Sequence, residues 1–156
     1  MKKIVSLISI LALTVFPFTI NTSAANQPVN QLTANQQIEY YSDGSYAITT
    51  LTENPVNRAS KGGSKSYSYY NSDNVLAWRV TLDGTFYYDG GTSSCTSSSV
   101  YYTIYNNIWK VTSAVASRSS NKAIGDFTVK RYLLLVPVQT ETVRLTITCS
   151  PNGTLS

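Results

Sequence analysis

Histidine is absent from this chain of 156 residues. Its absence excludes Ser-His-Asp and Cys-His nucleophile systems and the common zinc sites, and it removes the usual acid/base group near neutral pH. Helical periodicity is also missing, because no segment repeats its apolar residues every three to four positions. We therefore expect an all-β protein with no metal site, no cofactor and no enzymatic activity.

Charged residues are few, at 13% of the chain. There are 12 basic and 8 acidic residues, and loss of Lys2 and Lys3 with an N-terminal leader would leave 10 basic residues. In that remainder Lys130-Arg131 is the only adjacent basic pair. A polyanion binder needs clustered Lys and Arg, so nucleic acid is not an expected partner.

The N-terminus has the layout of a secretory signal peptide. Lys2 and Lys3 precede an apolar run from Ile4 to Ile20, and small residues follow up to Ala25. We predict a signal peptide over 1–25, cleaved near Ala25. An uncleaved membrane anchor is the competing interpretation, because the apolar run is rather long for a signal peptide.

The remainder is predicted to be one secreted, extracellular domain. Residues 26–37 are rich in amides and uncharged, which is typical of a flexible lead-in. Residues 38–156 are long enough to bury one core. We expect no stable membrane anchor after cleavage, because 150–156 has no apolar tail or basic cluster.

Alternating apolar and polar residues indicate β-strands. In Thr142–Cys149 the side chains of Val143, Leu145, Ile147 and Cys149 fall on one face. Similar short segments recur every eight to twelve residues between turn-forming sequences; they include Tyr46–Glu53, Val75–Leu82 and Val100–Tyr105. Seven to nine such strands predict an antiparallel β-sandwich, immunoglobulin-like or jelly-roll.

Two cysteines in an exported chain predict one disulfide, between Cys95 and Cys149. It would close a loop of about 55 residues and stabilise the fold by about 4 kcal/mol.

Asp83-Gly84 is predicted to be the turn of a β-hairpin, because glycine there can adopt φ > 0. The return strand then begins at Thr85. We expect Phe86 and Tyr88 to face the core and Tyr87 to face solvent, unless a bulge in the turn reverses the phase.

The most apolar stretch after the leader is Leu133–Val138, which contains Pro137. Since Pro137 cannot donate to a central ladder, we expect this run to end a buried strand or to cross between sheets at an edge. Together with the small size and mild positive charge, the run also suggests an alternative function as a membrane-active toxin or bacteriocin-like protein.

A second alternative is a carboxylate-dependent glycan hydrolase. Such enzymes need two acids that converge on one cleft, and Glu53 and Glu141 are the least implausible acids here. Four of the aspartates precede Gly or Asn in predicted turns, where they cap the backbone. Ser119-Ser120-Asn121-Lys122 fits the S-x-x-K motif of penicillin-recognising enzymes, but the associated motifs occur in reversed order.

Tyrosine is the abundant aromatic residue, with 12 in the chain, often as adjacent pairs. Adjacent strand residues point to opposite faces, so each pair should leave one ring outside. If Val100, Tyr102 and Ile104 are buried, Tyr101 and Tyr105 are exposed. We predict that Tyr87, Tyr101 and Tyr105 form a binding face for an extracellular glycan or protein.

Three segments, Gly84–Gly90, Tyr105–Lys110 and Thr146–Ser150, together with Ser94-Cys95-Thr96, resemble uncharacterised small secreted proteins of Gram-positive bacteria. The resemblance implies export from a bacterium with a thick wall. It implies no catalytic residue.

Overall fold

The structure, a computed structural model, describes residues 35–57 and 59–156. It contains eight β-strands within these ranges and no helix. The strands are β1 (Gln36–Tyr40), β2 (Tyr46–Asn57), β3 (Ser60–Tyr70), β4 (Leu76–Tyr88), β5 (Ser93–Ile104), β6 (Trp109–Ser119), β7 (Lys122–Leu133) and β8 (Val136–Thr148). The predicted signal peptide, 1–25, and most of the predicted lead-in lie outside the described residues.

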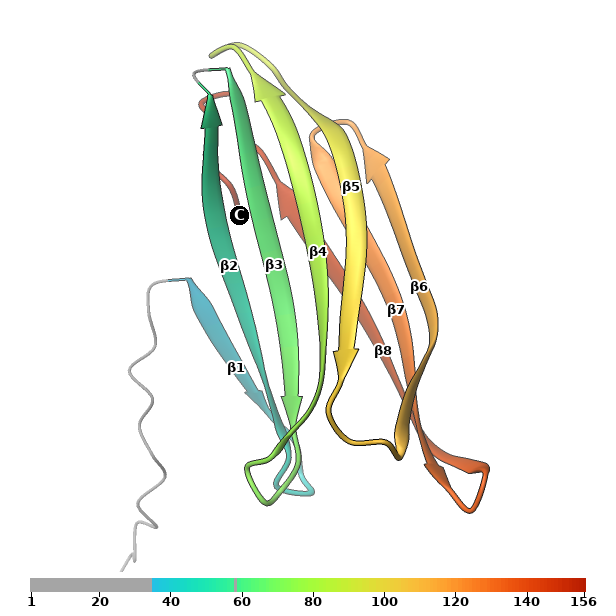
Figure 1. Ribbon diagram of the computed structural model, residues 1–156. Helices are drawn as coiled ribbons and strands as arrows, with labels where there is room; N and C mark the ends of the chain where they lie inside the picture. Colours follow the sequence, from blue (N-terminus) through green and yellow to red (C-terminus); the bar gives the residue numbers. More distant parts are fainter. Residues whose placement is uncertain (1–34, 58) are drawn as a thin grey trace, which may run out of the picture. The chain divides into compact units, whose positions relative to one another are not determined.

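The strands form two antiparallel sheets (Figure 1). β1 to β5 make a five-stranded sheet and β6 to β8 a three-stranded sheet. The smaller sheet packs on the larger one, with β7 and β8 opposite β3, β4 and β5. This confirms an all-β, two-layered antiparallel architecture.

The strand order corrects the finer prediction of an immunoglobulin-like or jelly-roll sandwich. Both of those topologies contain Greek-key crossovers. Here each hydrogen-bonded neighbour within a sheet is also the neighbour in sequence. The described chain is therefore a meander of hairpins, interrupted once where β5 leads to β6 in the other sheet. Within the described part of the chain no helix exists that could cross a membrane.

The core lies between the two sheets. As the alternation in Thr142–Cys149 predicts, Val143, Leu145, Ile147 and Cys149 are all buried. From the larger sheet Trp78 is fully buried and stacks on Tyr69 at 5.1 Å between ring centroids. The ring centroids of Trp109 on β6 and Trp78 on β4 lie 6.0 Å apart, so aromatic packing joins the two layers.

Asp83-Gly84 is not a turn, which corrects that prediction. β4 continues through both residues, and Gly84 lies opposite Gly63 of β3 and Ser98 of β5. A Cβ on Gly84 would lie 2.8 Å from the Phe86 ring and 2.9 Å from Cβ of Ala123. Glycine therefore serves close packing here rather than a positive φ.

The predicted inward and outward directions of the side chains at 86–88 are confirmed. Phe86 is fully buried, Tyr87 is exposed, and Tyr88 is half-buried against the core. The turn that ends β4 comes later, where the Asp89 carboxylate accepts hydrogen bonds from the N–H groups of Gly91 and Thr92.

The predicted disulfide is wrong. Cys95 and Cys149 are both free and buried, and they are not close to each other. The N–H of Cys95 donates to Ser120 O and that of Cys149 to Asn121 O, so the backbone of each cysteine is bonded to the β6–β7 turn. Burial raises the pKa of each thiol, which makes both poor nucleophiles.

Candidate functional site

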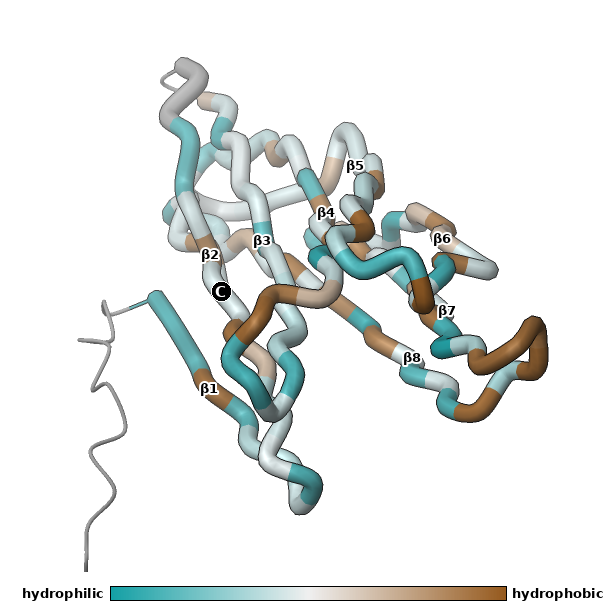
Figure 2. The backbone as a smooth tube through the Cα atoms, turned by 60° about the horizontal axis from the view of Figure 1, so that its bottom comes forward, coloured by the Kyte–Doolittle hydropathy of each residue, from teal (hydrophilic) through white to brown (hydrophobic). Residues whose placement is uncertain are grey.

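The tip of the β7–β8 hairpin is the most exposed apolar segment of the described chain. Leu134 is 91% exposed and Leu135 is 87% exposed. The exposed side chains of this tip, which we call the apolar hairpin, belong to Leu133, Leu134, Leu135, Val136 and Val138. Figure 2 shows the tip as a hydrophobic loop that extends beyond β7 and β8. The expected buried strand or crossover at this run is therefore wrong.

The turn of the apolar hairpin is chemically unusual. Leu133 pairs with Val136, and the two residues between them have φ values of 47° and 71°. Two-residue turns of this kind favour Asn-Gly, because both positions need φ > 0. A non-glycine residue in that region costs about 1–2 kcal/mol. Two leucines at the tip are thus unfavourable for the turn as well as for solvation.

Cations lie behind the apolar hairpin on the outer face of the three-stranded sheet. Lys110 and Lys130 are directly opposite each other on β6 and β7. Directly opposed residues have Cβ atoms about 4.5–5.5 Å apart, and like charges at that spacing repel. Neither lysine forms an ion pair with any residue that the structure describes.

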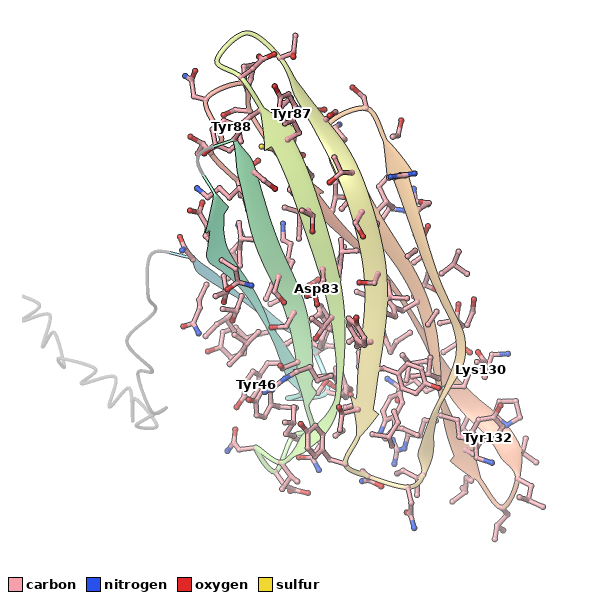
Figure 3. The ribbon with its side chains drawn as sticks, turned by 45° about the horizontal axis from the view of Figure 1, so that its top comes forward. Tyr46, Asp83, Tyr87, Tyr88, Lys130 and Tyr132 are labelled. Atoms are coloured by element: carbon pink, nitrogen blue, oxygen red, sulfur yellow. The ribbon has the colours of Figure 1, made fainter. Side chains whose placement is uncertain are left out.

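Tyr132 connects these cations to the base of the hairpin (Figure 3). Lys110 Nζ lies 5.3 Å from the centroid of the Tyr132 ring. The N–H of Tyr132 donates to Ile108 O at 2.8 Å, which fixes the base of the hairpin to the β5–β6 connection. Ile108 is itself 37% exposed and adds to the apolar surface.

The three tyrosines of the predicted binding face are all exposed. Tyr87 is opposite Ser94, however, whereas Tyr101 is opposite Thr81. Tyr87 and Thr81 are six positions apart on β4, which separates the two rings by about 20 Å. Tyr105 follows β5 in the connection that contains Ile108. The structure therefore does not bring Tyr87 together with the other two rings.

Tyr102 also differs from expectation. Val100 and Ile104 pack against the core, but Tyr102 is 55% exposed. It lies opposite Val80 on the inner side of β4. Because β5 is an edge strand, a large ring there extends past the covered part of the sheet.

The two acids considered for a hydrolase are far apart. Glu53 forms an ion pair with Lys61 at 2.6 Å, and its charge acts on Cys149. Glu141 is eight positions from Cys149 in sequence, about 26 Å along an extended strand. Paired catalytic carboxyl groups lie about 5–10 Å apart, so these two do not form such a pair.

Glu141 instead lines a groove between the five-stranded sheet and β8, the edge strand of the three-stranded sheet. The groove has a volume of about 550 Å³ and is lined by β1–β3 and by residues 141–146 of β8. We call it the edge groove. Inside it, the Tyr41 and Tyr67 hydroxyls are hydrogen-bonded at 2.5 Å. Burial raises the pKa of Tyr67, and Tyr41 and the charges of Glu39 and Glu141 raise it further.

A lysine also reaches into the edge groove. Lys65 Nζ donates to the backbone O of Thr146 at 3.0 Å, and burial lowers the Lys65 pKa. Among the described residues no group of three or more His, Cys, Asp and Glu side chains is placed to hold a metal ion.

Sequence reasoning missed the opposed lysines. Counting back from the predicted turn at Ser119–Lys122 places Lys110 opposite Arg131. A bulge at Thr112 shifts the register by one and places it opposite Lys130 instead. No residue pattern marks that bulge, so only the structure identifies this pair.

No protein-family model, no curated protein and no solved structure matches this chain.

Proposed function

We propose that this protein is an exported surface-interaction module that binds anionic lipid membranes reversibly through the apolar hairpin. The observation that carries the proposal is the pair Leu134 and Leu135, which are 91% and 87% exposed at a turn whose geometry disfavours leucine. Exposed apolar patches of this kind are typical of interaction surfaces.

The charges support a lipid partner. Lys130 precedes Leu134 by four positions, about 13 Å along the strand. An apolar segment that enters the boundary of a bilayer by about 5–10 Å would bring Lys110 and Lys130 near the phosphates. An anionic surface would then relieve the repulsion between the two lysines.

The expected affinity is moderate. Full burial of a leucine contributes about 1.5–3 kcal/mol, and a lysine near an anionic surface about 1 kcal/mol. Leu134 and Leu135 with the two lysines therefore contribute on the order of 5–8 kcal/mol before the cost of association. That range supports reversible attachment rather than insertion across the membrane.

The earlier alternatives receive less support. The tyrosine face predicted for a glycan or protein is divided between separated regions of the larger sheet. The hydrolase alternative lacks a converging pair at Glu53 and Glu141. We therefore assign the protein a binding role, with no catalytic residue.

The test is co-sedimentation of the chain from Asn26 onwards with vesicles of phosphatidylcholine, alone or mixed with phosphatidylglycerol. Wild type should bind the mixed vesicles. The double variant Leu134→Asn, Leu135→Gly should lose at least tenfold in affinity. Its thermal stability should not fall, because Asn-Gly suits the turn.

The matched control is Val115→Ser, which removes an exposed apolar side chain of β6 outside the hairpin and should bind as wild type does. Equal binding by the double variant would contradict the proposal. Reversible self-association of wild type, lost in the double variant and without vesicle binding, would assign the hairpin to a protein interface instead.

A further inference from the structure

The edge groove exists because the two sheets differ in width. β8 pairs only with β7, so its other edge is free of a strand for most of its length. β8 packs on β3 and β4 of the five-stranded sheet, so β1 and β2 form a part of that sheet that lies beyond the edge of the smaller one. A free strand edge presents unpaired N–H and C=O groups to any extended chain that reaches it.

The chain itself shows how that edge is used. Ser156 and Thr148 exchange two backbone hydrogen bonds, of 2.8 and 3.0 Å, and Cys149 forms an antiparallel bridge with Leu155. The C-terminal residues thus occupy the first position of a further strand beside β8. Alternation along an antiparallel ladder then directs the backbone groups of Thr146, Arg144 and Thr142 toward the same edge.

Those next positions are unpaired or weakly held. The carbonyl of Thr146 accepts only the Lys65 ammonium group. For the outward backbone groups of Arg144 and Thr142, no partner occurs among the described residues. The edge groove provides room beside them, with a volume of about 550 Å³.

The groove carries charges of both signs, with the Lys65 ammonium group at Thr146 and the carboxylates of Glu39 and Glu141 beside Tyr41 and Tyr67. The end that holds the two carboxylates favours a cationic side chain. The Arg144 side chain is neutralised by Asp126 at 2.6 Å. Neither Glu39 nor Glu141 forms an ion pair within the described chain, and both act on the Tyr41–Tyr67 pair. A positively charged side chain placed beside these tyrosines would meet two carboxylates.

We propose that the edge groove binds an extended peptide with a basic side chain, which adds to β8 as an antiparallel strand. Main-chain hydrogen bonds to Thr142 and Arg144 supply the affinity, as in other cases of strand addition. Glu39 and Glu141 select the basic residue. The hydrogen bond from the Lys65 ammonium group to the Thr146 carbonyl must break where the peptide extends along β8 as far as Thr146. This activity is separate from the apolar hairpin and does not depend on it.

The probe is the capped peptide Ser-Val-Thr-Lys-Thr-Val-Ser, titrated into the chain from Asn26 onwards and followed by amide chemical shifts and hydrogen exchange. Shifts and slowed exchange are expected at Thr142 and Arg144. The same peptide with Glu in place of Lys should bind at least tenfold more weakly.

Thr142→Pro is the decisive variant. Its missing N–H faces the free edge, so the β7 ladder is kept while peptide pairing is blocked. It should lose the peptide, whereas Thr142→Val, which keeps the N–H, should bind as wild type does. Amide spectra of the unliganded variants check that both are folded.

Three results would overturn the proposal. The first is an unperturbed β8 edge at millimolar peptide. The second is equal binding of the Lys and Glu peptides to wild type. The third is concentration-dependent protection of Thr142 without peptide, which would make the edge an interface between two copies of the chain.

Discussion

The ring of Tyr46 on β2 stacks on that of Tyr70 on β3, with 4.8 Å between the ring centroids. The ring centroid of Tyr40 on β1 lies 5.8 Å from that of Tyr46. On the inner side, Tyr67 and Tyr69 both stack on Trp78. Many of the tyrosines therefore have an aromatic partner within the fold. Cross-strand packing therefore explains part of their abundance.

The free cysteines give a prediction at the same scale. We expect Cys95 and Cys149 to react very slowly with a thiol reagent in the native protein, because burial raises the pKa of both thiols and limits access. In urea without a reducing agent, both should be labelled rapidly. Intact mass before and after labelling measures this. Labelling that requires a reducing agent would show that the two cysteines are bonded after all.

Among the elements, β8 and the hairpin that precedes it show what the sequence predicts and what it leaves out. The alternation of Val143, Leu145 and Ile147 identifies the buried face, because side-chain direction follows from the period of two. The position of Leu133–Val138 is not predictable in this way. An apolar run has the same composition whether a neighbouring layer covers it or not.

Aspartate-glycine pairs show the same limit. Asp43-Gly44 and Asp89-Gly90 are turns, with Gly44 and Gly90 at positive φ, whereas Asp83-Gly84 lies within β4. The two roles of glycine, positive φ and close packing, look alike in sequence. Only the approach of Phe86 and Ala123 distinguishes them.

The pairing of β6 with β7 gives a prediction for the lysines. We expect the double variant Lys110→Gln, Lys130→Gln to bind phosphatidylglycerol vesicles at least fivefold more weakly and with less dependence on salt, because two contacts of about 1 kcal/mol each are lost. Its free energy of unfolding should change by less than about 1 kcal/mol, because the removed repulsion is offset by the loss of the Lys110 contact with the Tyr132 ring. Vesicle co-sedimentation at two salt concentrations and urea unfolding measure both effects.

The control for this variant is Lys122→Gln, at the other end of β7, which should change vesicle binding much less. Unchanged binding by the double variant would limit the membrane contact to the apolar hairpin.

At the scale of the whole domain, Leu155 closes the sandwich. Leu155 is 6% exposed. Its side chain packs directly against Gly63 of the larger sheet: a Cβ added to Gly63 would lie 2.5 Å from Leu155 and 3.6 Å from Ile147. We expect Leu155→Ala to lower the free energy of unfolding by about 2–4 kcal/mol, as measured by urea denaturation. The exposed counterpart Leu134→Ala should change it by less than about 0.5 kcal/mol. Equal effects would mean that Leu155 does not pack between the sheets.

The sandwich class follows from many short alternating segments, but the order of its strands does not. Val80 and Val129 lie in different sheets and are both fully buried, so alternation describes them identically. Which strands share a sheet depends on where the chain crosses between layers. Here that crossing is the short Tyr105–Ile108 connection, which resembles any other turn in composition.

The meander has a consequence for how the chain folds during synthesis. Within each sheet every strand pairs with the strand before it, so hairpins can form as soon as they leave the ribosome, with little loop-closure entropy. The five-stranded sheet is complete at Ile104, yet Trp78, Val80 and Phe86 on its inner face are covered only when the three strands of the smaller sheet arrive. A nascent chain therefore presents a formed but uncovered apolar sheet for the time needed to add about fifty residues, a few seconds at typical rates. That interval is when a chaperone would bind it.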